Sequence, residues 1–117
     1  MLYDITPYPK PRMSRSDVWK DPPRACVAHY RAFCDRCVLA KIVLPEAGAN
    51  VTFYLPMPKS WNDDKKHRHR FQPHQEKPDL SNLLKALEDA VCKHDETIWR
   101  YGELKKLWAE RGAILIY

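Results

Sequence analysis

Residues 80–91 read LSNLLKALEDAV, and this stretch decides the fold of the chain more clearly than any other. Its apolar side chains recur at the three- and four-residue spacing that places them on one face of a helix. Ser81 is a favourable N-cap, so the sequence predicts a helix over residues 81–93. The opposite face is polar and presents Lys85 to whatever binds near the start of the helix. The apolar stripe consists of Leu80, Leu83, Leu84, Leu87, Ala90 and Val91.

A second helix is predicted upstream, over residues 23 to about 40. Asp21-Pro22-Pro23 is a helix-start signal, with Asp21 as the N-cap and a proline in the first turn. Because both cysteines of the CxxC sequence fall on its apolar stripe, they are expected in the core as small apolar residues. A zinc site is the alternative, and it would use Cys34, Cys37, Cys92 and His94.

Four segments have the pattern of strands. Residues 51–57 alternate in polarity, which predicts a half-buried strand after a loop at 45–50. Pro56 and Pro58 end that strand or place it at a sheet edge. Near the C-terminus, an aromatic-rich stretch over 97–108 is interrupted at Gly102, and a turn at 110–112 precedes an apolar strand. A short strand at 2–6 completes the set.

These elements predict one α+β domain over residues 1–117, with a small mixed or antiparallel sheet and two main helices. Residues 1–20 are expected to form an extended, proline-rich, basic arm, and residues 58–78 a basic loop without visible periodicity. A run of this kind is usually a solvated loop. In the other interpretation it tracks phosphates, with Trp61 and Phe71 available to stack on exposed bases. The candidate DNA-binding residues of the two segments are Arg12, Arg15, Lys65, Lys66, Arg68 and Arg70.

The charge balance favours a polyanionic partner. The 117 residues contain 20 lysines and arginines against 15 acidic residues, for a net charge of +5, so nucleic acid is the first candidate. No apolar run is long enough to span a membrane, and the proline-rich start does not resemble a signal peptide. We therefore expect a cytoplasmic protein with no membrane partner and no small-molecule cofactor.

The residues around the predicted helix at 81–93 also carry the candidate chemistry. Asp79 lies just before this helix, while Ser81 and Lys85 are four residues apart and share a face. Asp95 and Glu96 follow the helix and return to the same site if the next strand pairs near the strand that precedes residue 58. Carboxylates beside a lysine form a natural Mg²⁺ site for phosphodiester hydrolysis. The alternative role for Asp79 is that of an ordinary helix-start carboxylate.

The segment KPDLSNLLKALEDAV at 77–91, followed by HDETIW at 94–99, resembles the RusA family of Holliday-junction resolvases, which is common in bacteriophages and prophages. In that family a KPD-x-D-N-L-x-K-A sequence precedes a pair of aspartates. The segments PMPKSW at 56–61 and KLW at 106–108 extend the resemblance over nearly the whole chain.

The resemblance implies a homodimeric, Mg²⁺-dependent endonuclease, able to use Mn²⁺ instead, that cuts four-way DNA junctions symmetrically in the cytoplasm of a bacterial host. Asp79 and Asp95 match the metal-binding aspartates, and Lys85 matches the catalytic lysine. Asn82 matches the motif asparagine and is expected to position other groups, and with Lys77 it joins the candidate DNA-binding residues. His74 is expected to be a loop residue rather than a general base.

Two departures from the family pattern affect the expected metal site. Ser81 stands where the family has its second aspartate, and His94 stands where it has the first of the paired aspartates. Three explanations stay open. Another carboxylate compensates, water fills the position beside Ser81, or the chain is a non-catalytic junction-binding protein of the same fold. The carboxylates that could compensate are Glu76, Glu88, Asp89 and Glu96.

Overall fold

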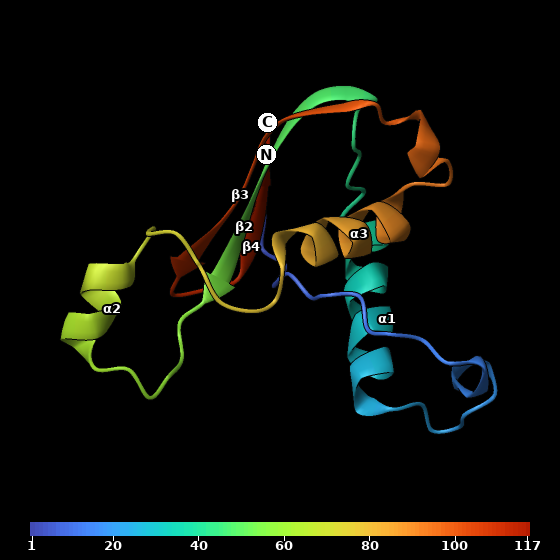
Figure 1. Ribbon diagram of the computed structural model, residues 1–117, viewed down its shortest axis with the longest axis horizontal. Coiled ribbons are helices and arrows are strands. Elements are labelled where there is room, and N and C mark those ends of the chain that lie inside the picture. The colour runs from blue at the N-terminus through green and yellow to red at the C-terminus, as the bar shows by residue number, and fades with distance from the viewer.

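A computed structural model describes residues 1–117. Figure 1 shows a curved sheet with two helices at one end of its long strands and a third helix beyond the other end. The two termini lie side by side, and the Met1 amino group donates to the Ile116 carbonyl. In chain order the elements are β1 (Leu2–Tyr3), the 3₁₀ turn η1 (Arg15–Val18), α1 (Ala25–Leu39), β2 (Ala47–Pro56), α2 (Asp63–His69), α3 (Leu80–Val91), the 3₁₀ turn η2 (Asp95–Thr97), β3 (Arg100–Ala109) and β4 (Ala113–Ile116).

The four strands form a mixed sheet in the order β1-β4-β2-β3. Strand β2 pairs in parallel with β3 and antiparallel with β4, so Phe53 is flanked by Lys106 and Ile114. The mixed sheet and the α+β class confirm the sequence prediction. Because β2 is central, the prediction that it could be an edge strand is wrong, and Pro56 is simply its last residue.

Strand β2 is longer and more buried than its sequence pattern predicts. It begins at Ala47, within the stretch predicted as a loop, and register shifts against β3 accommodate Gly48 and Asn50 there. Thr52, expected on a solvent face, is only 1% exposed because neighbouring strands flank it on both sides. Gly102 does not interrupt β3. A side chain there would collide with the Asn50 amide, which accepts a hydrogen bond from the Glu103 backbone at 2.7 Å.

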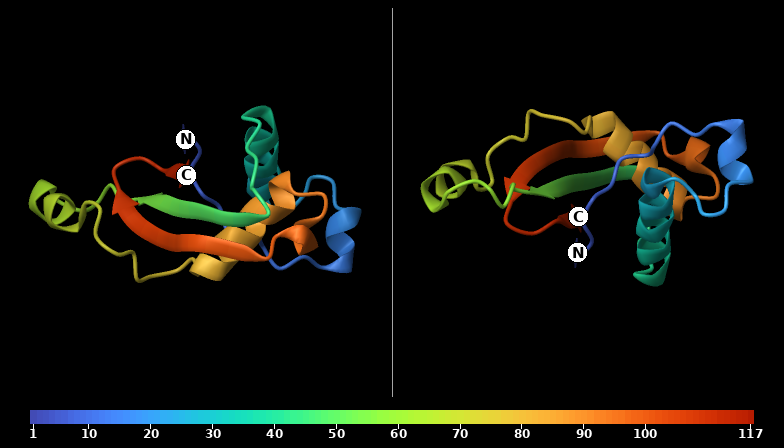
Figure 2. Two further views of the ribbon diagram at one scale, coloured as in Figure 1. Left: turned by 90° about the horizontal axis from the view of Figure 1, so that it is seen from above. Right: turned by 90° about the horizontal axis from the view of Figure 1, so that it is seen from below.

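The core lies between one face of the sheet and helices α1 and α3 (Figure 2). The leucine stripe of α3 is buried as predicted, with Leu83 and Leu87 at most 1% exposed. On α1, Cys37 is fully buried and Cys34 packs beside the core, which confirms the predicted stripe, although Lys41 is exposed beyond the helix end. No helix is long and apolar enough to cross a membrane.

Both helix starts differ from the predictions. Helix α1 begins at Ala25 with Arg24 at the N-cap, so Asp21 does not cap it. Helix α3 begins at Leu80 with Asp79 at the N-cap and ends at Val91, which moves Ser81 into the first turn. Asp79 has the extended backbone typical of an N-cap, and this backbone leaves Ser81 no capping role.

The first 20 residues are not a wholly extended arm. Only Leu2–Tyr3 form a strand, and η1 folds back against the start of α1. Asp17 in η1 is 3% exposed and accepts hydrogen bonds from Arg24 Nε at 2.8 Å and Nη2 at 2.7 Å. The hydrogen bonds from Arg24 hold the pKa of Asp17 well below its usual range. This ion pair anchors the arm to the domain.

The stretch 58–78 contains a helix, so the prediction of a loop there is wrong. The Asn62 side chain caps α2 by accepting from the Lys65 backbone at 2.8 Å. Acidic Asp63 and Asp64 occupy its first turn and basic side chains its last, an order that suits the helix dipole. Trp61 packs against the Trp108 ring at 4.8 Å and fixes the helix to the end of β3.

Candidate active site

The exposed side of α3 and the η2 turn bring together Lys85 and Asp95. The Lys85 Nζ atom lies 3.3 Å from Asp95 Oδ2 and 3.4 Å from Oδ1 of Asp89, one helical turn further along. The hydrogen bond to Asp95 and then the charge of Asp89 raise the pKa of Lys85. Half of the Lys85 side chain remains exposed, so a phosphate can reach it from solvent.

The N-terminal arm also reaches this side of α3. Lys10 Nζ lies 2.5 Å from Asp89 Oδ2, and the Asn82 amide donates to the Lys10 carbonyl at 3.2 Å. The basic composition of the arm was the only sequence signal for this contact. Sequence analysis therefore missed Lys10, because its partner on α3 lies 79 residues away.

Asp79 lies at the N-terminal end of the same helix and is exposed. It makes no capping hydrogen bond with its side chain, and it borders a small cavity of about 400 Å³ together with Pro9, Lys77 and Asn82. Lys106 of β3 holds the chain segment that precedes Asp79, since it donates to the carbonyl of Pro78 at 2.7 Å and to that of Glu76. Lys106 is a second residue that sequence analysis did not assign to the site.

Asp79 and Asp95 do not form a compact cluster. Asp79 precedes Lys85, the partner of Asp95, by six residues, which is about 9 Å along a helix axis. The structure assembles no group of three or more His, Cys, Asp or Glu side chains that could hold a metal ion.

Three of the four acidic residues considered as substitutes for the missing aspartate are engaged with other side chains, and the fourth, Glu76, is exposed. Glu88 accepts a hydrogen bond from the Tyr101 hydroxyl at 2.6 Å, and Glu96 lies 3.3 Å from the exposed His94. Asp89 is shared between two lysines. Glu76 contributes its backbone carbonyl to Lys106, and its carboxylate is exposed.

The donors that remain suit one kind of magnesium site. In many phosphoryl-transfer enzymes, Mg²⁺ keeps several waters and binds one or two carboxylates together with substrate phosphates. Asp79 and Asp95 supply two carboxylates, and Ser81 offers an exposed hydroxyl between them in sequence. Because the two carboxylates lie apart, an ion beside either of them would need water and a phosphate to complete its ligands.

The cysteines are unsuited to a zinc site. Burial raises the pKa of Cys37 to about 12, and it also raises the pKa of Cys34 and Cys92. These cysteines belong to no cluster of three or more His, Cys, Asp or Glu side chains that could hold a metal ion. His94, the fourth candidate ligand, is three-quarters exposed and beside Glu96. The position of the CxxC cysteines in the core agrees with their expected packing role.

The candidate DNA-binding residues flank the site instead of forming one patch. Lys65, Lys66 and Arg68 lie on α2 at one end of the molecule, and Arg15 lies on η1 at the other, with α3 between them (Figure 1). The longest dimension of the molecule is 45 Å, so these two groups of cations lie far apart.

Some of these flanking side chains already have partners. Arg68 lies 3.4 Å from Asp64, Arg70 pairs with Glu110, and Lys65 lies over Trp61. The Arg12 carbonyl accepts from Arg24, while the Arg12 side chain is exposed. Lys77 and Asn82 border the cavity beside Asp79.

The two candidate stacking rings differ in exposure. Trp61 is engaged with Trp108, His69 and Lys65, whereas Phe71 is 59% exposed. His74 lies outside the helices and strands, as predicted for a loop residue, but it is buried: it is 5% exposed, with its ring centroid 4.1 Å from that of Trp108. Burial and the nearby Lys106 lower the pKa of His74, whose Nδ1 has no hydrogen-bond partner.

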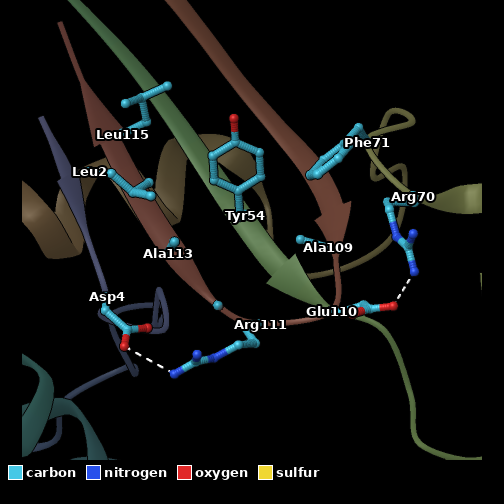
Figure 3. Close-up of a pocket in the computed structure, with 11 residues that line it drawn as sticks. Leu2, Asp4, Tyr54, Arg70, Phe71, Ala109, Glu110, Arg111, Ala113 and Leu115 are labelled. Carbon is cyan, nitrogen blue, oxygen red and sulfur yellow. Dashed lines mark hydrogen bonds and ion pairs between the residues drawn. The ribbon is translucent and has the colours of Figure 1, made fainter.

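A larger cavity, of about 710 Å³, lies away from Lys85 on the sheet face that α1 and α3 leave uncovered (Figure 3). Leu2, Tyr54, Phe71 and Leu115 give it an apolar floor. Two ion pairs lie at its rim, Arg70 with Glu110 and Arg111 with Asp4. Its position separates it from the chemistry on α3.

Comparison with known protein families adds evidence that the geometry alone does not supply. Residues 5–116 match the family model described as Endodeoxyribonuclease RusA. No curated protein and no solved structure matches the chain. The matched range covers nearly every residue, from just after β1 to the end of β4.

Proposed function

Since the chain belongs to the RusA family of endodeoxyribonucleases, we propose that it cuts four-way DNA junctions by Mg²⁺-dependent hydrolysis at the Lys85 face of α3. The observation that carries this proposal is the 3.3 Å contact of Lys85, in the helical part of the family motif, with Asp95, in the segment that follows the helix. The Lys85 ammonium group is held by carboxylates and its side chain is half exposed, so it is suited to bind a phosphate.

The proposed roles follow from the chemistry of each side chain. Lys85 stabilises the negative charge that develops on the phosphate during attack by water. Asp79 and Asp95 are the residues that would hold Mg²⁺, or Mn²⁺ in its place. When bound, the ion supplies positive charge beside the phosphate and favours the ionisation of water. Lys106 holds the backbone that presents Asp79.

DNA binding is assigned to the two flanks of α3. The α2 cations Lys65, Lys66 and Arg68, together with Arg70, form one flank, and Arg12 and Arg15 of the arm form the other. Contacts of this kind track phosphates and give affinity that falls steeply with salt. They provide no base-reading element, so recognition would rest on the branched shape of the DNA.

We further propose that the active form is a homodimer, whose two sites match the two-fold symmetry of a four-way junction. The apolar floor around Leu2 and Leu115 is the surface assigned to the second copy. Its rim carries Asp4 and Arg111, so charges of opposite sign can meet those of an identical surface. Leu115→Arg should give a monomer in sedimentation, whereas Val38→Arg, at an exposed position on α1, should not. A Leu115→Arg protein that remains dimeric would exclude this surface.

The proposal is tested with an end-labelled synthetic four-way junction in Mg²⁺, with a linear duplex of the same sequence as control. The unaltered protein should nick the junction at symmetric positions, and Asp79→Asn should lose that activity while still binding. Cleavage that survives in Asp79→Asn would show that the site is assigned wrongly.

Ser81 favours a second candidate function, that of a junction-binding protein that does not cut. The chain has a hydroxyl where the family has a carboxylate, and no third carboxylate takes its place in the structure. Ser81→Asp separates the two functions. If only this variant cuts, the chain is a binding-only member of the family. If neither protein cuts in Mg²⁺ or Mn²⁺, the nuclease proposal fails.

A further inference from the structure

One ion pair on α3 comes from outside the family motif. Lys10 in the arm lies 2.5 Å from Asp89, and both side chains are mostly buried, with 35% and 22% of their surfaces exposed. The Lys10 carbonyl is also held, by Asn82 one turn before Lys85. Asn82, Lys85 and Asp89 share one helix face, so Lys10 lies alongside Lys85.

We propose that Lys10 is a positioning residue of the active site, which occupies Asp89 and thereby leaves Lys85 available to a DNA phosphate. This inference rests on the proposed function of Lys85. It assigns a role in the reaction to the N-terminal arm, which sequence analysis treated only as a DNA contact.

The distances support unequal sharing of Asp89. Its Oδ2 atom lies 2.5 Å from Lys10, whereas its Oδ1 atom lies 3.4 Å from Lys85. Because charge-assisted hydrogen bonds strengthen as they shorten, Asp89 is bound mainly to Lys10. Lys10 therefore weakens, without removing, the competition of Asp89 with a phosphate for Lys85, and Asp95 at 3.3 Å is the other competitor. Without Lys10, the full charge of Asp89 would act on Lys85 from one turn away.

The test compares Lys10→Ala, Lys10→Arg, Asp89→Asn and the double variant Lys10→Ala/Asp89→Asn on a labelled four-way junction. Lys10→Ala should lower kcat by about tenfold, within the range of coupling energies of side chains in contact. Lys10→Arg should recover most of the activity. The double variant should cut close to the rate of Asp89→Asn alone, because the competing carboxylate is then absent. Junction affinity without divalent metal should change less than about twofold in all four variants.

A second readout does not depend on cleavage. Acetylation of Lys85 by acetic anhydride, followed by mass spectrometry with the exposed Lys93 as internal reference, reports how firmly Lys85 is held. Lys10→Ala should slow this reaction, and the double variant should restore it. If the unaltered protein does not cut but the acetylation pattern holds, the proposed function fails while the role of Lys10 survives.

Three results would overturn the inference. One is a double variant whose kcat loss is at least as large as that of Lys10→Ala. Another is a Lys10→Ala effect confined to junction affinity, which would make Lys10 a DNA contact. The third is unchanged Lys85 acetylation in Lys10→Ala. A thermal unfolding midpoint for each variant verifies that the protein remains folded.

Discussion

The Nζ atom of Lys85 lies 3.3 Å from Oδ2 of Asp95, so the middle of α3 is joined to the η2 turn that follows the helix. The contact brings together the helical part of the family motif and the segment that follows it, without burying the lysine. It is the geometric basis of the proposed reaction, and each of the following predictions depends on it or on the elements that surround it.

Lys85→Ala should lower kcat by about 100-fold or more, the loss typical when one preorganised stabiliser of transition-state charge is removed. Junction affinity should fall only modestly, because many other cations contact the DNA. Single-turnover cleavage and metal-free binding measure the two effects separately. Lys93→Ala removes an exposed lysine just beyond the same helix and should cut normally. A loss equal to that of Lys85→Ala would indicate that cleavage depends on positive charge in this region in general, rather than on the position of Lys85.

Lys106→Met should reduce cleavage without unfolding the protein. The variant keeps the length and apolar stem of the side chain but removes the ammonium that binds the carbonyls of Glu76 and Pro78. Asp79 then loses the support of the segment that precedes it, and we expect a fall in kcat of about tenfold. Lys105→Met, at the next position of β3, is the matched control. Normal cleavage by Lys106→Met would show that this support is unnecessary.

The charges on α2 should set the salt dependence of junction binding. Lys66→Gln and Arg68→Gln are each expected to reduce the slope of log affinity against log salt by about one, because each removes one phosphate contact. The rate at saturating protein should stay the same. Lys41→Gln, at the exposed end of α1, should leave the slope unchanged. Unchanged slopes in both α2 variants would remove α2 from the DNA-binding surface.

Stability should fall as the pH drops below about 6.5, the ordinary pKa of histidine. His74 is buried with a lowered pKa, so the folded state holds it neutral whereas the unfolded chain takes up a proton. His74→Phe keeps a ring against Trp108 and should flatten this part of the curve. Unfolding midpoints at pH 7.5 and pH 5.5 provide the comparison, and equal slopes for both proteins would show that another group is responsible.

The parts of the fold that follow from local patterns were predictable. The leucine stripe of α3 and the alternating residues of β2 both form the expected elements, because each pattern suits only one backbone geometry. The helix α2 was missed although Asn62 and the acidic first turn are helix-start signals. It was predicted as a solvated loop because residues 65–70 are a run of basic side chains and histidines.

The parts of the site that depend on distant contacts were not predictable. Asp79, Lys85 and Asp95 were candidates from their placement around the helix and from the family resemblance, and the structure brings only Lys85 and Asp95 into contact. Lys10 contacts Asp89 of α3, and Lys106 binds the carbonyl of Pro78 just before α3. Both lysines come from other elements, and no local sequence pattern predicts such contacts. The central position of β2, which buries Thr52, likewise depends on the order of strands in the sheet.

The central claim is that the face of α3 beside η2 cuts DNA, and the most direct test is junction cleavage in Mg²⁺ by the unaltered protein, Asp95→Asn and Asp35→Asn. Asp35 is an exposed carboxylate on α1, so its variant is a matched control. The account predicts symmetric nicking by the unaltered protein and Asp35→Asn, with a loss of about 100-fold or more in Asp95→Asn. Equal cleavage by all three proteins, or none by any of them, would contradict it.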